Sequence, residues 1–417
     1  MKVLLLAGEE SGVLYADLIR DAVLKRCPDA EIRGYGDYGF KIEDLAVMGV
    51  GQVLKKIFYF LRVKRTMERA IAEWRPDVVC TVDYPGMNLK LAAHAKSWGI
   101  RAVHVVCPQV WAWKRGRIPK IEAALDRLCC FFPFEPALFS AGFAEFVGHP
   151  LADEMMRWRE KVEVENQSSN RLNRRIVELG VGVGCRCTKD GENSAVGLHL
   201  RPTPSSQTSQ TSQTPQTNQV LAVLPGSRLG EIEKHMPVLL EVVRELRMSP
   251  GLGVSALKVV IPAANERAHR AITAFVSRLS SPEASVEIRR GGAREILRQA
   301  DAAVVASGTA TLEAALAGCP TVLVYRVGWL FAFLARRFIK GVKHIGLANI
   351  IAEKAGVTCP MPELLQENFT VDGVLKWLRP WLTDEKANEK ARGELSKTMK
   401  LLQSDGDSIT KIARNLV

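Results

Sequence analysis

Two series of short apolar runs, separated by a long polar tract, restrict the folds open to this chain. Amphipathic stretches with helical spacing lie between the runs of each series. Short buried strands that alternate with helices are typical of a parallel sheet covered by helices. The runs lie at 3–7, 78–82, 102–106, 128–132 and 146–147 in the first series, and at 220–224, 257–261, 302–306 and 321–324 in the second. The sequence therefore predicts the α/β class, with two doubly wound, Rossmann-like halves.

The domain division follows from the chain length and from the polar tract. With 417 residues, 47% of them hydrophobic, the chain is longer than one core usually organises, and it has apolar residues enough for two. The tract is rich in Ser, Thr and Gln and has no apolar side chains to offset the entropy of ordering it. We expect a first domain at 1–164, a disordered insertion at 165–218 and a second domain at 219–417, whose C-terminal helix can pack back on the first.

The first apolar run and the composition indicate a cytosolic protein. That run ends at Gly8 and is followed by two acidic residues, which suits a buried strand better than a signal peptide. No window reaches the roughly 18 uninterrupted apolar residues of a membrane-spanning helix. Nine cysteines occur without the paired spacing of a metal site, so we expect neither a bound metal nor another cofactor.

The net charge of +12 indicates an anionic partner. Nucleic acid, an anionic membrane surface and anionic substrates such as sugar nucleotides all meet that description. The cations are scattered along the chain and accompany no recognisable nucleic-acid reader motif, so we expect no nucleic acid.

Asp83 is the candidate general base. It directly follows the apolar run at 78–82, and open parallel sheets bind ligands beyond the carboxyl ends of their strands. A sugar hydroxyl is too weak an acid to attack unaided at neutral pH, and a carboxylate within hydrogen-bond reach can take its proton. The alternative is a helix N-cap or a turn residue beside Pro85.

Two further segments of the first half are candidates for the cleft. The loop Gly8-Glu-Glu-Ser-Gly12 joins the first strand to a helical pattern, so its glycines permit a tight turn with the amides directed into the cleft. Its two adjacent acids would hydrogen-bond sugar hydroxyls or organise the loop, which makes Glu10, Ser11 and Gly12 candidates for the acceptor side. His149 lies where the chain crosses to the second half. A plain strand-to-helix connection and a structural histidine are the alternatives.

Two loops of the second half carry the parts of a nucleotide site. Gly226, Ser227 and Arg228 follow its first run and combine a turn, helix N-terminal amides and a guanidinium, which together suit a pyrophosphate. In the second loop, Ser307, Gly308 and Thr309 are placed to reach phosphate oxygens, and Glu313 to accept hydrogen bonds from a ribose diol. For the first loop, the alternative is a turn in which the arginine has no function. For Glu313, the alternative is an acidic residue in the first turn of a helix, where the helix dipole stabilises a negative charge.

Two stretches, 55–65 and 329–340, mix aromatic and aliphatic side chains with several cations. Such stretches can lie in a lipid interface with their cations on the headgroups. A buried helix with a basic solvent face is the alternative for each.

Taken in order, the motifs resemble those of the lipid-A-disaccharide synthase family. The resemblance covers nearly the whole chain apart from the insertion, and its most specific segment is Pro-Gln-Val-Trp-Ala-Trp, which includes Trp111. The motifs are Gly8-Glu-Glu-Ser-Gly12, Asp83-Tyr-Pro-Gly-Met-Asn88, Cys107-Pro-Gln-Val-Trp-Ala-Trp113, Phe132-Pro-Phe-Glu135, Gly148-His-Pro150, Leu224-Pro-Gly-Ser-Arg228 and Ser307-Gly-Thr-Ala-Thr-Leu-Glu313.

The resemblance implies a GT-B fold, with two Rossmann-like domains facing across a cleft. It implies transfer of 2,3-diacylglucosamine from its UDP carrier to 2,3-diacylglucosamine 1-phosphate, with inversion, no metal and no cofactor. Asp83 would be the base and Arg228 would stabilise the departing UDP. The acceptor side would include Asn88, Trp111 and His149. The family also implies peripheral attachment to the cytosolic face of the inner membrane and a possible homodimer.

The first loop departs from the family pattern, because Val13 stands where an Asp is common. Two other readings stay open. One is a different UDP-sugar transferase or an epimerase of the same fold, against which the segment Val110-Trp-Ala-Trp113 argues. The other is a noncatalytic protein that binds a UDP-sugar or a lipid, whose function Asp83→Asn would leave intact.

Overall fold

The computed structural model describes residues 1–41, 45, 57–112, 115–158, 160–161, 164, 219–249, 257–278, 286–327 and 343–417, apart from the side chains of Glu10 and Ser11. The predicted insertion, the stretch 329–340 and the start of the stretch 55–65 lie outside these residues. Met1–Met155 and Asn218–Val417 form one compact unit. The predicted domain limits at 164 and 218 stay predictions, because most of the segment between them is not described.

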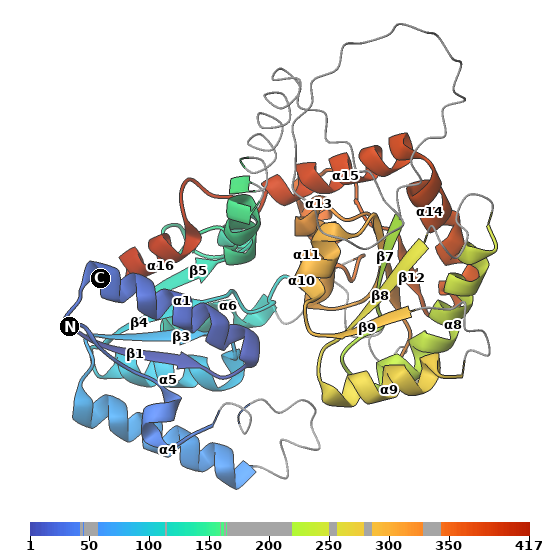
Figure 1. The fold of residues 1–417 in the computed structure, drawn as a ribbon. Helices are drawn as coiled ribbons and strands as arrows, with labels where there is room; N and C mark the ends of the chain where they lie inside the picture. The colour runs from blue at the N-terminus through green and yellow to red at the C-terminus, as the bar shows by residue number, and fades with distance from the viewer. Residues whose placement is uncertain are drawn as a thin grey trace, which may run out of the picture. The chain divides into compact units, whose positions relative to one another are not determined.

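The first half of the chain forms a six-stranded parallel sheet with the order β2-β1-β3-β4-β5-β6 (Figure 1). Helices α1 (Glu10–Arg26), α4 (Ile57–Trp74), α5 (Pro85–Ser97) and α6 (Ile118–Ala124) join or cover its strands, with short 3-10 turns at Tyr35–Tyr38, Arg115–Arg117 and Pro136–Leu138. The strands are β1 (Lys2–Ala7), β2 (Glu31–Arg33), β3 (Val78–Val82), β4 (Arg101–Val105), β5 (Arg127–Cys130) and β6 (Ala144–Phe146).

The second half forms another six-stranded parallel sheet, with the order β12-β11-β10-β7-β8-β9. Its strands are β7 (Gln219–Leu224), β8 (Leu257–Ala263), β9 (Val286–Arg290), β10 (Ala302–Ala306), β11 (Thr321–Tyr325) and β12 (Glu363–Leu365). Its helices are α8 (Leu229–Arg247), α9 (Glu266–Val276), α10 (Ala293–Gln299), α11 (Thr309–Ala317), α13 (Leu347–Ala355), α14 (Val371–Thr383) and α15 (Glu385–Lys400), and a 3-10 turn spans Gln366–Asn368. The two sheets confirm the predicted α/β class with two Rossmann-like halves.

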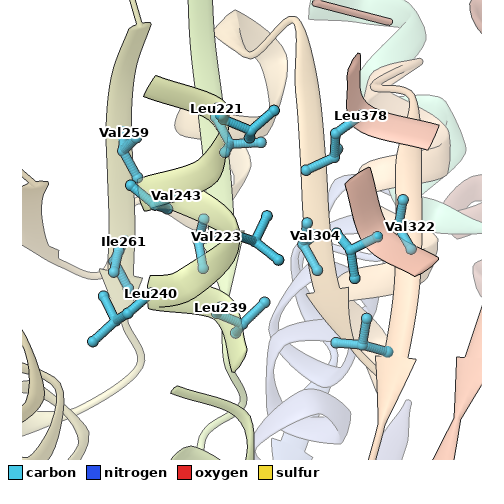
Figure 2. Close-up of a cluster of buried hydrophobic side chains, with 14 of the residues drawn as sticks. Leu221, Val223, Leu239, Leu240, Val243, Val259, Ile261, Val304, Val322 and Leu378 are labelled. Atoms are coloured by element: carbon cyan, nitrogen blue, oxygen red, sulfur yellow. The ribbon is translucent and has the colours of Figure 1, made fainter. Parts of the chain in front are cut away.

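Alternation along the central strands divides each core between the two faces of its sheet. In β7, Leu221 and Val223 point to the face covered by α8 and α14, where Leu239, Val243 and Leu378 pack against them (Figure 2). Successive strand residues point to opposite faces, so a strand buried on both sides reads as a continuous apolar run. The three strands that the apolar runs did not predict, β2, β9 and β12, are edge strands whose residues are partly exposed.

The last helix, α16 (Ser408–Leu416), packs beside α1 in the core of the first sheet (Figure 1). Its apolar residues recur at the spacing of one helix face, and Ile409 and Ile412 join the cluster that contains Ile19. The Asp153 carboxylate accepts a hydrogen bond of 2.8 Å from the Ser408 amide. The end of the chain is therefore part of the first half's core.

In the part of the chain that the structure describes, no helix combines the length and the apolar character needed to cross a lipid bilayer.

His104 is a fully buried side chain of β4. Its Nδ1 atom is 2.7 Å from the Thr81 hydroxyl, and its Nε2 atom has no hydrogen-bond partner among the described residues. Burial disfavours the charged imidazolium and lowers the His104 pKa to about 3. His104 is therefore neutral in the folded protein at physiological pH.

We expect this histidine to make the protein less stable in mild acid. Below pH 6.5 the unfolded chain takes up a proton that folded His104 does not bind until about pH 3. In that window the free energy of unfolding falls with pH by up to about 1.4 kcal/mol per pH unit. Urea unfolding of wild type and His104→Gln at pH 7 to 4.5 measures the difference between the two slopes. Parallel curves would contradict this prediction.

Candidate active site

Asp83 lies on a strained turn between β3 and α5. Asp83 and Tyr84 have φ values of 49° and 51°, a left-handed conformation that non-glycine residues rarely adopt and that costs free energy. The Asp83 amide donates to the Val105 carbonyl at 2.9 Å, and the Tyr84 amide donates to Asp83 Oδ1 at 2.8 Å. The turn therefore fixes the carboxylate at the end of its strand.

Asn88 holds this turn in place. Its side-chain amide nitrogen donates to the carbonyls of Leu6, Val82 and Asp83, the last at 2.8 Å, and its Oδ1 accepts from the Tyr35 hydroxyl at 2.8 Å. The side chain is fully buried. We expected Asn88 in the cleft, but its side chain is buried and its hydrogen bonds point into the protein, where they hold the Asp83 turn.

The first loop packs against the same turn. A Cβ atom on Gly8 would overlap the ring of Tyr84, and one on Gly12 would lie 3.3 Å from the Val82 carbonyl oxygen. Both glycines are thus needed for close approach of the loop to β3. The backbone of Glu10 and Ser11 begins α1, and their side chains are outside the described part. Val13, the departure from the family pattern, packs at the edge of the sheet core.

Asp83 lines a cavity of about 320 Å³ that we call the base cavity. Burial raises the pKa of the Asp83 carboxyl, and the hydrogen bond from the Tyr84 amide lowers it in part. A carboxylate with a raised pKa is a stronger base than an ordinary Asp. The cavity is also lined by Tyr15, Gln109, Arg117, Glu135, His149 and Thr309, among others.

His149 reaches the base cavity from a ring of aromatic side chains, Tyr15, Phe131 and Phe132. Its Nδ1 atom accepts a hydrogen bond of 3.2 Å from the Leu151 amide, which leaves the proton on Nε2. Burial, with a smaller contribution from Arg294, lowers its pKa to about 3. His149 is therefore a neutral hydrogen-bonding group and not a cation.

Trp111 contacts Glu135, a residue of the base cavity wall. Its ring is buried, and Nε1 donates to Glu135 Oε1 at 3.1 Å, while the Phe132 amide donates to Glu135 Oε2 at 3.1 Å. Burial raises the pKa of Glu135 to about 8. Trp113 lies outside the described residues. Trp111 therefore reaches the cavity only through Glu135, whose place in the cavity wall the motif Phe132-Pro-Phe-Glu135 did not reveal, whereas Gln109 and Val110 of the same segment line the cavity directly.

A second cavity, of about 610 Å³, contains every residue predicted to bind the nucleotide. We call it the donor cavity. It is also lined by Glu9, whose pKa is raised by burial and then by the nearby charge of Asp83. The predicted residues in its wall are Gly226, Ser227, Arg228, Ser307, Gly308, Thr309 and Glu313. Residues 262–264, at the end of β8, and Gly291, directly after β9, also line it and were not predicted.

The loop after β7 has a conformation that only glycine adopts easily. Gly226 has φ of +113°, and a Cβ atom there would lie 2.5 Å from Glu231 Oε2. His235 braces the loop from below, because its Nδ1 donates to the Pro225 carbonyl at 2.7 Å and its Nε2 accepts from the Arg326 amide at 3.0 Å. Arg228 lies 3.3 Å from Glu231, so its guanidinium is held at the cavity mouth.

The loop after β10 begins α11 with Gly308 at φ of +156°. The amides at this helix N-terminus carry a partial positive charge suited to phosphate oxygens. One turn into the helix, Glu313 Oε1 accepts a hydrogen bond of 2.8 Å from Arg294 Nε, and Arg294 Nη1 donates to Glu154 at 3.0 Å. Glu313 is therefore oriented by Arg294, which the sequence patterns did not single out.

Comparison with known proteins identifies the relatives of this chain. The model of the family described as "Lipid-A-disaccharide synthetase" matches residues 3–186 and 199–417. A lipid-A-disaccharide synthase from Chromohalobacter salexigens is 33% identical over 396 residues, which cover 92% of this chain and 89% of the relative.

Solved structures share the fold at much lower identity. The UDP-GlcNAc 2-epimerase from Neisseria meningitidis bound to UDP-GlcNAc matches with a TM-score of 0.56 and 11% identity, over 100% of this chain and 99% of that one. MurG from Acinetobacter baumannii matches with a TM-score of 0.52 and 12% identity, again over 100% and 99%. These likenesses show the fold alone, the GT-B arrangement of two Rossmann-like domains.

We expect Gly226→Ala to weaken binding of UDP by about 10-fold or more, because the new side chain forces the loop out of a glycine-only conformation. Gly230→Ala is the matched control, since Gly230 lies four residues along, in the first turn of α8, with open space around its Cβ position. Isothermal titration with UDP measures both. Equal affinities of the two variants for UDP would show that this loop does not bind the nucleotide.

Proposed function

The chain belongs to the lipid-A-disaccharide synthetase family, and from its two cavities we propose how it performs the transfer. It is a glycosyltransferase of lipid A biosynthesis. We propose that the donor is UDP-2,3-diacylglucosamine, that the acceptor is 2,3-diacylglucosamine 1-phosphate, and that the products are the β(1→6) disaccharide 1-phosphate and UDP. The observation that carries the proposal is the place of Asp83, a buried carboxylate in a cavity that shares Thr309 with the donor cavity.

Inversion at the sugar requires a single displacement. The acceptor 6-hydroxyl would lie in the base cavity, where Asp83 takes its proton as the oxygen attacks the anomeric carbon. The hydrogen bonds of Asn88 hold the strained backbone at Asp83, and the Tyr84 amide bonds to its carboxylate, so the base keeps one orientation before the substrate arrives. Neutral His149, with its proton on Nε2, is placed to donate a hydrogen bond to a substrate oxygen.

The departing UDP takes a negative charge as the glycosidic bond breaks. Arg228, the amides of the loop after β7 and the N-terminus of α11 provide positive charge in the donor cavity without a metal ion. Glu313, oriented by Arg294, has its second carboxylate oxygen left to accept from a ribose hydroxyl. The donor side thus stabilises the leaving group while the acceptor side removes the proton.

We expect Asp83→Asn to lower kcat by about 10²- to 10⁴-fold, because the variant keeps the shape of the site and loses the base. Release of UDP and formation of the lipid disaccharide are measured in detergent, with Asp21→Asn, on the exposed face of α1, as control. Since burial raises the Asp83 pKa above 3.8, the acidic limb of the wild-type pH profile should lie above that value. Full activity of a folded Asp83→Asn protein would remove this residue from the mechanism, and no product from either protein would favour another transferase of the same fold.

We also propose that the protein attaches to the cytosolic face of the inner membrane through α4. Phe58 is 83% exposed and Leu61 44% exposed, and both lie on the helix face that also carries Arg62 and Arg65. Apolar side chains flanked by cations suit an anionic lipid interface. A second copy of the chain stays a prediction from the family resemblance, which light scattering can check.

We expect the double variant Phe58→Glu, Leu61→Glu to lose most of its binding to vesicles of phosphatidylglycerol and phosphatidylethanolamine, since two apolar contacts become charges of the wrong sign. Met248→Glu is the matched control, because Met248 is 80% exposed but lies at the end of α8. Co-sedimentation measures the bound fraction. Loss of binding in the control alone, or in neither variant, would place the lipid contact elsewhere.

A further inference from the structure

The side chains of Cys107, Cys130 and Glu135 form a cluster at the wall of the base cavity. Their ligand atoms, two thiol sulfurs and one carboxylate oxygen, all lie within 4.8 Å of one another. The three residues are 4%, 0% and 1% exposed. Among the described residues, no other group of three such side chains comes this close together.

The fold holds the three groups rigidly. Cys107 follows β4 and Cys130 ends the neighbouring strand β5, with Val105 opposite Cys129 in the register between them. Alternation along β5 sends Cys130 to the same apolar cluster as Cys107, and Cys129 to the opposite face of the sheet. Glu135 is fixed by its hydrogen bonds from Trp111 and Phe132.

The donor set selects one chemical class of ligand. Two thiols and a carboxylate suit a thiophilic divalent cation such as Zn²⁺, whereas Mg²⁺ and Ca²⁺ prefer oxygen donors alone. With Zn–S near 2.3 Å and Zn–O near 2.0 Å, tetrahedral ligand atoms lie roughly 3.3 to 3.8 Å apart, so small side-chain movements suffice. Three protein ligands leave one position open, and Cys107 and Glu135 also line the base cavity, from which water can reach it.

A purely hydrogen-bonded cluster accounts for part of this arrangement. Cys107 Sγ donates to the Pro108 carbonyl at 3.3 Å, so this thiol has a partner without a metal. Glu135, however, is buried with no ion-pair partner in the described part of the chain. A carboxyl group buried in this way keeps its proton, and a divalent cation can replace that proton as the partner of the carboxylate.

We propose that Cys107, Cys130 and Glu135 bind Zn²⁺, and that the bound ion inhibits glycosyl transfer. Binding releases the protons of the two thiols and of Glu135 to solvent, and the ion draws Glu135 away from Trp111. The wall of the base cavity then changes shape beside Asp83. The binding part of the proposal stands without the proposed reaction, whereas the inhibition part depends on it.

The full-length protein, reduced and stripped of metal, is titrated with Zn²⁺ by calorimetry and with Cd²⁺ by its thiolate charge-transfer absorption. We expect one equivalent to bind, with affinity lowered by about 100-fold or more in Cys130→Ala. Cys129→Ala is the matched control, because it removes a buried thiol from the next residue on the other face of β5, and it should bind like wild type. Glu135→Gln, which keeps the side-chain shape, tests the third ligand if Cys130→Ala does not fold. No binding by wild type, or equal loss in Cys129→Ala, would overturn the site.

In the transfer assay, one equivalent of Zn²⁺ should lower wild-type activity by about 10-fold or more, and a chelator should restore it. Cys130→Ala should resist the same concentration. Equal inhibition of wild type and Cys130→Ala would overturn the regulatory role even where the calorimetry shows the site. Because the calorimetry does not use the reaction, failure of the proposed function would leave the binding result intact.

Discussion

The buried amide of Asn88 is the contact on which the Asp83 turn, and with it the proposed base, depends. It bonds to carbonyls of two strands and of the Asp83 turn, so it ties the end of β1 to the end of β3 and holds two consecutive residues in a left-handed conformation. Burial makes these hydrogen bonds costly to break, because the freed groups would have no water. The strain at Asp83 is thus supported by the surrounding core, and the carboxylate is oriented before any substrate binds.

Parallel strand order explains why the remaining side chains gather around that turn. Strands β3, β4 and β5 are neighbours and all run the same way, so the segments that follow them meet at one edge of the sheet. Asp83, Cys107 and Glu135 come from those three segments. The same geometry in the second sheet brings the loops after β7 and β10 together as the wall of the donor cavity.

Electrostatics separates the roles of the polar groups at the site. Burial raises the pKa of Asp83 and lowers that of His149, so the first is a stronger base than usual and the second is neutral. In the donor cavity, Arg294 instead keeps Glu313 paired with a cation. One set of residues is thereby suited to removing a proton and the other to binding a charged leaving group and its ribose.

The sequence by itself determined the central strands of the two sheets and the two loops, after β7 and β10, that carry the predicted residues of the donor cavity. Apolar runs predicted the buried central strands. The turns were predicted by the glycines and small polar residues that follow those runs, because both signals are local. The apolar runs did not predict edge strands such as β2 and β9, because a partly exposed strand does not need a continuous run of apolar residues. Only the tertiary structure decided that Asn88 points inward, that Trp111 holds Glu135, that Arg294 orients Glu313, and that Cys130 and not Cys129 faces Cys107. Each of these depends on strand register and on which face a side chain takes, and contacts between residues far apart in the chain leave no periodic trace in its sequence.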